Sequence, residues 1–122
     1  MIVAGIIAIL AAVSLGFYGD YITRAARTDA RSALTSTAAS LEKCRSIYGA
    51  YNHGNCNVNF AVTSDEGYYS IAQPAVADLT ASTFSLTATP MGRQLADTEC
   101  DSLSLTNTGL KSGTGTDPAE CW

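Results

Sequence analysis

The sequence predicts an α+β fold in which one long N-terminal helix packs, through its C-terminal half, on a small antiparallel β-sheet. Three observations support this prediction. Residues 1–17 carry no charge, residues 22–48 repeat apolar positions with a helical period, and the residues after about position 50 form short alternating runs. One long helix followed by a series of strands is typical of an α+β domain.

The first segment, MIVAGIIAILAAVSLGF, is apolar throughout. As a helix it would span about 26 Å, slightly less than the ~30 Å hydrocarbon core of a bilayer. A secretory signal peptide would need basic residues before the apolar stretch, and this sequence shows none there. A buried core helix would need cover on every face, and about a hundred further residues are too few for that. We therefore expect a membrane helix that neighbouring subunits later bury.

Two glycines, Gly16 and Gly19, lie at the end of this apolar segment. Each costs roughly 1 kcal/mol relative to alanine inside a helix, so the helix can bend or melt there. Close packing of one helix on another also favours glycine. The sequence leaves both interpretations open.

The second part of the helix is amphipathic, and its apolar and small residues recur with a mean step close to one helical turn. This stripe, which we expect to face the sheet, comprises Ile22, Ala26, Ala30, Leu34, Thr37, Leu41, Cys44 and Tyr48.

Charged residues lie beside the stripe, just beyond the apolar segment. We expect them to form a solvated or intersubunit charged face, consisting of Asp20, Arg24, Arg27 and Arg31. Direct binding of nucleic acid is not expected, because the chain has a net charge of −4 and a pI of about 4.6, whereas contact with a phosphate backbone calls for a basic surface.

Four short runs with strand-like alternation follow: residues 58–62, 66–72, 82–88 and 101–107. Turn-rich links between them favour an antiparallel meander. The apolar face of this sheet, which includes Leu86 and Leu103, needs a cover that the helix stripe can supply. The Gly/Thr/Ser-rich residues 106–120 are expected to form a loop.

The four cysteines allow three pairings. Proximity in the sequence favours Cys44 with Cys56 and Cys100 with Cys121, so the second disulfide would close the C-terminal loop. Two disulfides in so small a chain indicate an oxidising compartment outside the cytoplasm. Trp122 is expected either to cover the closed loop or to form an exposed adhesive tip.

Nothing in the sequence suggests catalysis, a metal or a cofactor. A single histidine, His53, cannot build a serine-histidine-aspartate triad or a zinc site with these cysteines. The acidic run at residues 97–101 lacks the glycine of a calcium loop, since Ser102 stands at the sixth position, and a solvated acidic edge is expected instead.

Several segments together point to one family: the N-terminal MIVAGIIAILAAVSLGFYGDY, then ITRAARTDARSAL, EGYYSI, FSLTATPMGRQLADTEC, LSLTNTGLK and the terminal CW. They resemble the bacterial type IV pilins, and more narrowly the pilE-like type IV pilins of Gram-negative bacteria. The resemblance covers nearly the whole chain. It implies the type IV pilin fold and a non-enzymatic structural subunit of a pilus filament that supports surface attachment, motility or DNA uptake.

The resemblance also implies how the subunit is processed and assembled. Such a subunit is held in the inner membrane, cleaved and N-methylated, and then built into a surface pilus, where it would contact copies of itself in a helical homopolymer, other pilins and the inner-membrane assembly machinery. The family's leader, methylated first residue and buried glutamate would lie upstream of Met1. The filament core would be formed by Ile2, Val3, Ile6, Ile7, Ile9, Leu10, Val13, Leu15 and Phe17.

Gly16 stands where many pilins have a helix-kinking proline, and we expect the backbone between about residues 14 and 22 to be non-helical in an assembled filament. The expected organisation is an apolar helix over 1–21 and a head over 22–122. The head would contain the helix to about residue 50, a loop over 51–65, a meander over 66–107 and the disulfide-closed loop over 100–122. The alternatives are a type II secretion pseudopilin and a minor pilin that binds DNA or another ligand.

Overall fold

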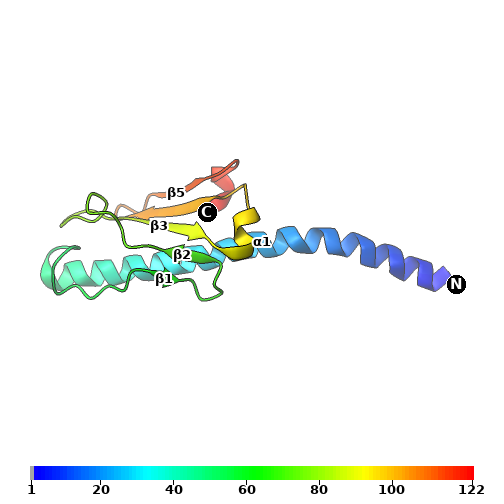
Figure 1. Cartoon of the computed structure of the whole chain (residues 1–122), viewed down its shortest axis with the longest axis horizontal. Helices are drawn as coiled ribbons and strands as arrows, with labels where there is room; N and C mark the ends of the chain where they lie inside the picture. Colours follow the sequence, from blue (N-terminus) through cyan, green and yellow to red (C-terminus); the bar gives the residue numbers. More distant parts are fainter. Residues whose placement is uncertain (1) are drawn as a thin grey trace.

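A single helix, α1 (Ile2–Tyr48), runs the full length of the molecule, and the rest of the chain packs against its C-terminal half (Figure 1). The computed structural model describes residues 2–122, with every side chain in that range except those of residues 14–17. The helix ends where Gly49 takes a positive φ of 80° and donates its N–H to the carbonyl oxygen of Arg45 at 2.7 Å. Glycine adopts this left-handed conformation without steric cost, which explains why the helix stops there.

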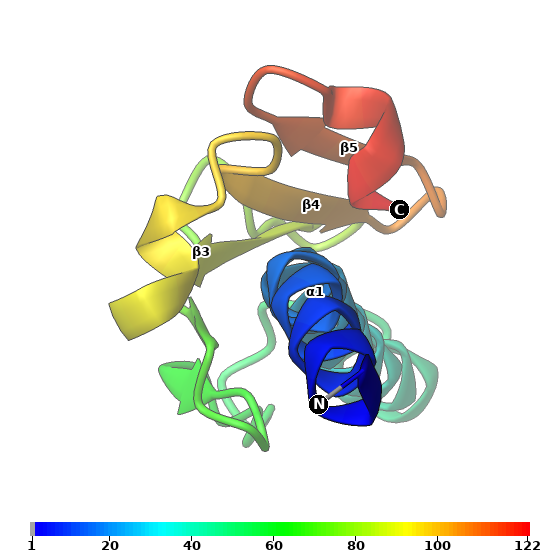
Figure 2. The ribbon, with the colours of Figure 1, turned by 90° about the vertical axis from the view of Figure 1, so that its right-hand side faces the viewer.

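The sheet has five antiparallel strands in sequence order: β1 (Val62–Thr63), β2 (Tyr69–Ile71), β3 (Ser85–Pro90), β4 (Ser102–Thr106) and β5 (Lys111–Thr114). Two short 3₁₀ helices flank them, η1 (Gly92–Ala96) between β3 and β4 and η2 (Pro118–Cys121) after β5. Seen along α1, the sheet wraps around one side of the helix and leaves the other side bare (Figure 2).

One row of paired residues crosses the whole sheet: Val62, Ile71, Ala88, Leu103 and Gly113. Ile71, Ala88 and Leu103 are fully buried. Alternate residues of a strand point to the same face, so this row forms part of the layer that faces α1.

The helix contributes Ala30, Leu34 and Leu41 to the core, all of them fully buried. The predicted α+β fold, with the C-terminal half of a long helix on a small antiparallel sheet, is therefore confirmed. The predicted stripe extends one residue too far, because Tyr48 is 42% exposed and stacks on His53 with ring centroids 4.7 Å apart.

Two strand predictions were wrong. In the run 58–62 only Val62 pairs, because Ala61 takes a φ of 62° that interrupts an extended strand, while Val58 and Phe60 pack on the core from a loop. Conversely, β5 lies inside the segment predicted as a loop. Its sequence KSGT has no apolar alternation because Gly113 lies directly against Cys121, where a Cβ would overlap the cysteine side chain.

The disulfides link Cys44 with Cys56 and Cys100 with Cys121, the pairing that sequence proximity favours. The Cα–Cα distance is 5.6 Å in each. The first ties the end of α1 to the following loop, and the second joins the start of β4 to the end of the chain.

Replacing Leu34 with alanine should lower the free energy of unfolding by about 2–5 kcal/mol, because the cavity would lie between helix and sheet. The measurement is denaturant unfolding of the full chain in detergent, followed by the fluorescence of Trp122, the only tryptophan. Ser32→Ala, at an exposed position of the same turn, should change the value by no more than about 0.5 kcal/mol. Equal losses for the two variants would contradict the packing described.

Candidate assembly surface and the charged clamp at its edge

The N-terminal half of α1 extends beyond the head and is not covered by it (Figure 1). Its large apolar side chains are 53–82% exposed, and they are Ile2, Val3, Ile6, Ile7, Ile9, Leu10 and Val13. The side chains of Leu15 and Phe17, also predicted for the filament core, lie outside the described residues. By length and composition this helix could cross a membrane. An exposed apolar surface of this size marks a site that lipid or another protein covers.

The glycines at the end of this surface lie within an unbroken helix in the single subunit. Apart from its chain neighbours and the nearby backbone of α1, no described atom lies within 4 Å of a Cβ built at Gly19, so packing against the rest of the subunit does not account for this glycine. The Thr23 hydroxyl donates to the Gly19 carbonyl oxygen at 3.1 Å. Melting of residues 14–22 in an assembled filament stays a prediction.

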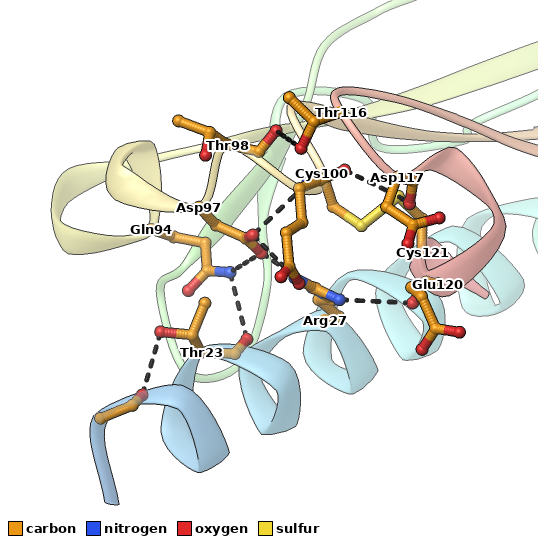
Figure 3. Close-up of polar contacts among 12 residues, drawn as sticks. Thr23, Arg27, Gln94, Asp97, Thr98, Cys100, Thr116, Asp117, Glu120 and Cys121 are labelled. Carbon is orange, nitrogen blue, oxygen red and sulfur yellow. Dashed lines mark hydrogen bonds and ion pairs between the residues drawn. A yellow bond between two sulfur atoms is a disulfide. The ribbon is translucent and has the colours of Figure 1, made fainter. Parts of the chain in front are cut away.

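C-terminal to these glycines, the head contacts the helix through Arg27 (Figure 3). Its Nε and Nη2 donate to the two carboxylate oxygens of Asp97 at 2.8 and 2.7 Å, and Nη2 also donates to Glu99 at 2.8 Å. Asp97, by hydrogen bonding first of all, and Glu99 raise the pKa of Arg27 although burial opposes the rise. The guanidinium is therefore held in its charged form.

The prediction that Arg27 belongs to an exposed charged face was wrong. Its side chain is 2% exposed, because Asp97, Glu99 and the C-terminal segment close over it. The predicted solvated acidic edge was also wrong for Asp97, which is 5% exposed. The two charges look independent in the sequence, although each is buried because the other neutralises it.

Gln94 of η1 completes this polar cluster. Its side-chain amide donates to the Thr23 carbonyl oxygen at 3.2 Å, the Tyr69 hydroxyl at 3.1 Å and the Asp97 carboxylate at 2.9 Å. Burial raises the pKa of Tyr69. Gln94 was not predicted, because a buried glutamine in a single short 3₁₀ helix has no periodic signal in the sequence. We call Arg27, Gln94, Asp97 and Glu99 the charged clamp.

The C-terminal segment closes over the charged clamp. Arg27 Nη1 donates to the Glu120 carbonyl oxygen at 3.4 Å, and Arg31 Nε donates to that of Cys121 at 3.1 Å. Arg31 is thus partly committed to the head rather than free for a neighbour. Trp122 donates its indole N–H to the Ser112 carbonyl oxygen at 2.7 Å and is half-buried, which agrees with a covering role over β5.

The other two residues of the predicted charged face, Asp20 and Arg24, are exposed on the helix. The only ion pairs among the described residues are those of Arg27 with Asp97 and Glu99, so Arg24 has no partner of this kind there. Of the predicted charged face, Asp20 and Arg24 are therefore the part that is available to another chain.

The comparisons with known proteins agree with this architecture. A model of the family described as "Type IV minor pilin ComP, DNA uptake sequence receptor" matches residues 17–104. The chain belongs to this family of type IV pilins. Among solved structures, a type IV pilin from Shewanella oneidensis is similar, with 31% sequence identity, a TM-score of 0.52, and coverage of 73% of this chain and 89% of that one. No protein with a curated description gives a significant match.

These matches confirm the type IV pilin fold that the resemblance implied. The charged clamp lies at the N-terminal end of the part of α1 that the head covers.

Replacing Arg27 with methionine should destabilise the head by about 3–5 kcal/mol, because Asp97 would lose the cation that compensates its burial. Arg24→Met should change the free energy of unfolding by less than about 0.5 kcal/mol. Both values come from the unfolding measurement proposed for Leu34→Ala. A loss below 1 kcal/mol for Arg27→Met would show that the charged clamp is not needed for stability.

Proposed function

We propose that this pilin is a subunit of a type IV pilus filament, built in by bundling of the apolar half of α1 with those of its neighbours. The observation that carries the proposal is the uncovered apolar half itself, from Ile2 to Val13. Its partners in this role are copies of itself, other pilins and the inner-membrane assembly machinery.

The same surface suits the pool of subunits before assembly. Held in the inner membrane, the apolar half of α1 would lie in lipid, which is as apolar as the side chains of a helix bundle. Passage from the bilayer into a filament core exchanges one apolar environment for another, so the helix need not meet water on the way. The head, closed by two disulfides, would lie on the outer side of that membrane.

Leu10→Glu should remove the protein from filaments sheared off the cell surface, because a carboxylate would have to be buried among apolar helices. Val76→Glu is the matched control, since Val76 is a 92% exposed apolar residue of the head. Immunoblots of the sheared and membrane fractions make the comparison. Undiminished recovery of Leu10→Glu in the sheared fraction would contradict this mode of assembly.

DNA capture by the filament is a second candidate, favoured by the family to which the chain belongs, which is described as a DNA uptake sequence receptor. It runs against the expectation drawn from the net charge of −4. A local contact is compatible with that charge, because five cationic side chains remain exposed: Arg24, Lys43, Arg45, Arg93 and Lys111. Lys43 and Arg45 lie near the C-terminal end of α1, far from the apolar half, and the Arg45 guanidinium lies over the Tyr51 ring, 4.9 Å from its centroid.

The purified chain should retain a labelled DNA duplex in a manner that weakens steeply with salt, since phosphate contacts release counterions. The double variant K43A/R45A should lower the affinity several-fold, and Arg24→Ala, close to the apolar half, should leave it unchanged. If the wild-type chain showed no salt-dependent retention, this candidate would be wrong while filament assembly would stand.

A further inference from the structure

The two flanks of α1 differ in charge at the level where the head begins, because Arg24 lies on one flank, one turn after Asp20, and Asp29 lies on the other. With about 100° of rotation per residue, Asp29 lies about 100° to one side of the buried Ala30 and Arg24 about 120° to the other. The two side chains are therefore on opposite flanks of the helix, separated by about 7.5 Å along its axis. Arg24 is exposed, whereas Asp29 is half-buried beside the turn between β1 and β2.

The acidic flank contains a groove of about 290 Å³ between α1 and the turn that joins β1 to β2. The groove is lined by Ile22, Ala25, Ala26, Asp29, Glu66 and Tyr68. Asp29 and Glu66 give it two carboxylates, and the apolar residues give it walls that suit the stem of a long side chain.

Asp29 is incompletely hydrogen-bonded. Its Oδ1 accepts the backbone N–H of Glu66 at 3.2 Å, whereas its Oδ2 is buried and has no donor among the described residues. Arg93 lies on the same side of the head, but its guanidinium is over the Tyr68 ring, 5.9 Å from the centroid, and forms no ion pair with Asp29. A buried carboxylate oxygen without a donor costs roughly 1–3 kcal/mol, so an external cation would find a site prepared for it.

We propose that Arg24 of a second copy of this chain binds in this groove, between Asp29 and Glu66. Arg24 is exposed and has no ion pair among the described residues, and it lies beside the apolar half that assembly must bury. Arg24 fits the groove by its positive charge and by its position along the helix axis. Two parallel copies shifted by about 7.5 Å bring Arg24 of one opposite Asp29 of the other. Rotation about the soft χ2 of Asp29 turns its second oxygen toward the guanidinium.

Such a contact is heterologous, because one flank of a copy meets the opposite flank of the next. A heterologous contact repeats without closing on itself in pairs, which is what a filament requires. The inference rests on the proposed filament assembly and deepens it, by giving the neighbouring α1 helices a register and a direction.

Cysteine cross-linking of filaments tests the register. All four native cysteines are in disulfides, so cysteines introduced in the double variant R24C/D29C would be the only free thiols. Their places on opposite flanks prevent a bond within one chain. Under mild oxidation, sheared filaments should yield dimers and higher oligomers on non-reducing gels, and R24C or D29C alone should yield none.

The matched control is R24C/S36C. Ser36 is exposed on the same flank as Asp29 but lies about 10 Å farther along the axis, so this pair should not cross-link. R24C/E66C uses the exposed acidic residue of the groove and keeps the test available if Asp29→Cys disturbs the fold. Cross-links from R24C/S36C that equal those from R24C/D29C would overturn the register.

Wild-type protein in the sheared fraction is the reference for every variant. If the wild type is in filaments and both R24C/D29C and R24C/E66C enter them but stay monomeric, the proposed contact is wrong and filament assembly stands. If the wild type itself is missing from filaments, the proposed function is wrong, and the contact that rests on it is wrong with it. Dimers from R24C alone would indicate a symmetric contact instead and would also overturn the proposal.

Discussion

The buried ion pair between Arg27 and Asp97 joins two parts of the chain that are 70 residues apart in the sequence. It fixes the loop between η1 and β4 on α1, and through Gln94 it extends to Thr23 on the helix and Tyr69 on β2. Burying either charge alone would be costly, so each needs the other in place. Together with the packing of Ala30, Leu34 and Leu41 on the sheet, this pair sets where along the helix the head begins.

The charged clamp also divides α1 into two parts with different physical requirements. C-terminal to Thr23, the sheet and the clamp hold the helix by many contacts that persist in the isolated subunit. N-terminal to it, the large apolar side chains from Ile2 to Val13 are 53–82% exposed, and the two glycines weaken the backbone. Any change in conformation on assembly is therefore expected in the N-terminal part, while the head can remain as it is.

Much of the fold could be predicted from the sequence because it depends on periodic patterns. The stripe from Ala26 to Cys44, the alternation in β3 and β4 and the spacing of the cysteines are all local signals, and each agrees with the structure. The clamp could not be predicted, because the partner of Arg27 lies 70 residues away and nothing local distinguishes Arg27 from the exposed Arg24. Strand β5 was missed for a related reason. Its glycine is required by contact with Cys121, and that contact exists only in the folded chain.

The contact between Arg27 and the Glu120 carbonyl oxygen spans 93 residues of the 122, and the neighbouring bond from Arg31 reaches Cys121, one residue from the end of the sequence. Contacts so distant in the chain form only after the intervening segments are in place. A subunit shortened before Glu120 would leave Arg27 and Arg31 without these two acceptors and would expose the side of the helix that residues 120 and 121 now cover.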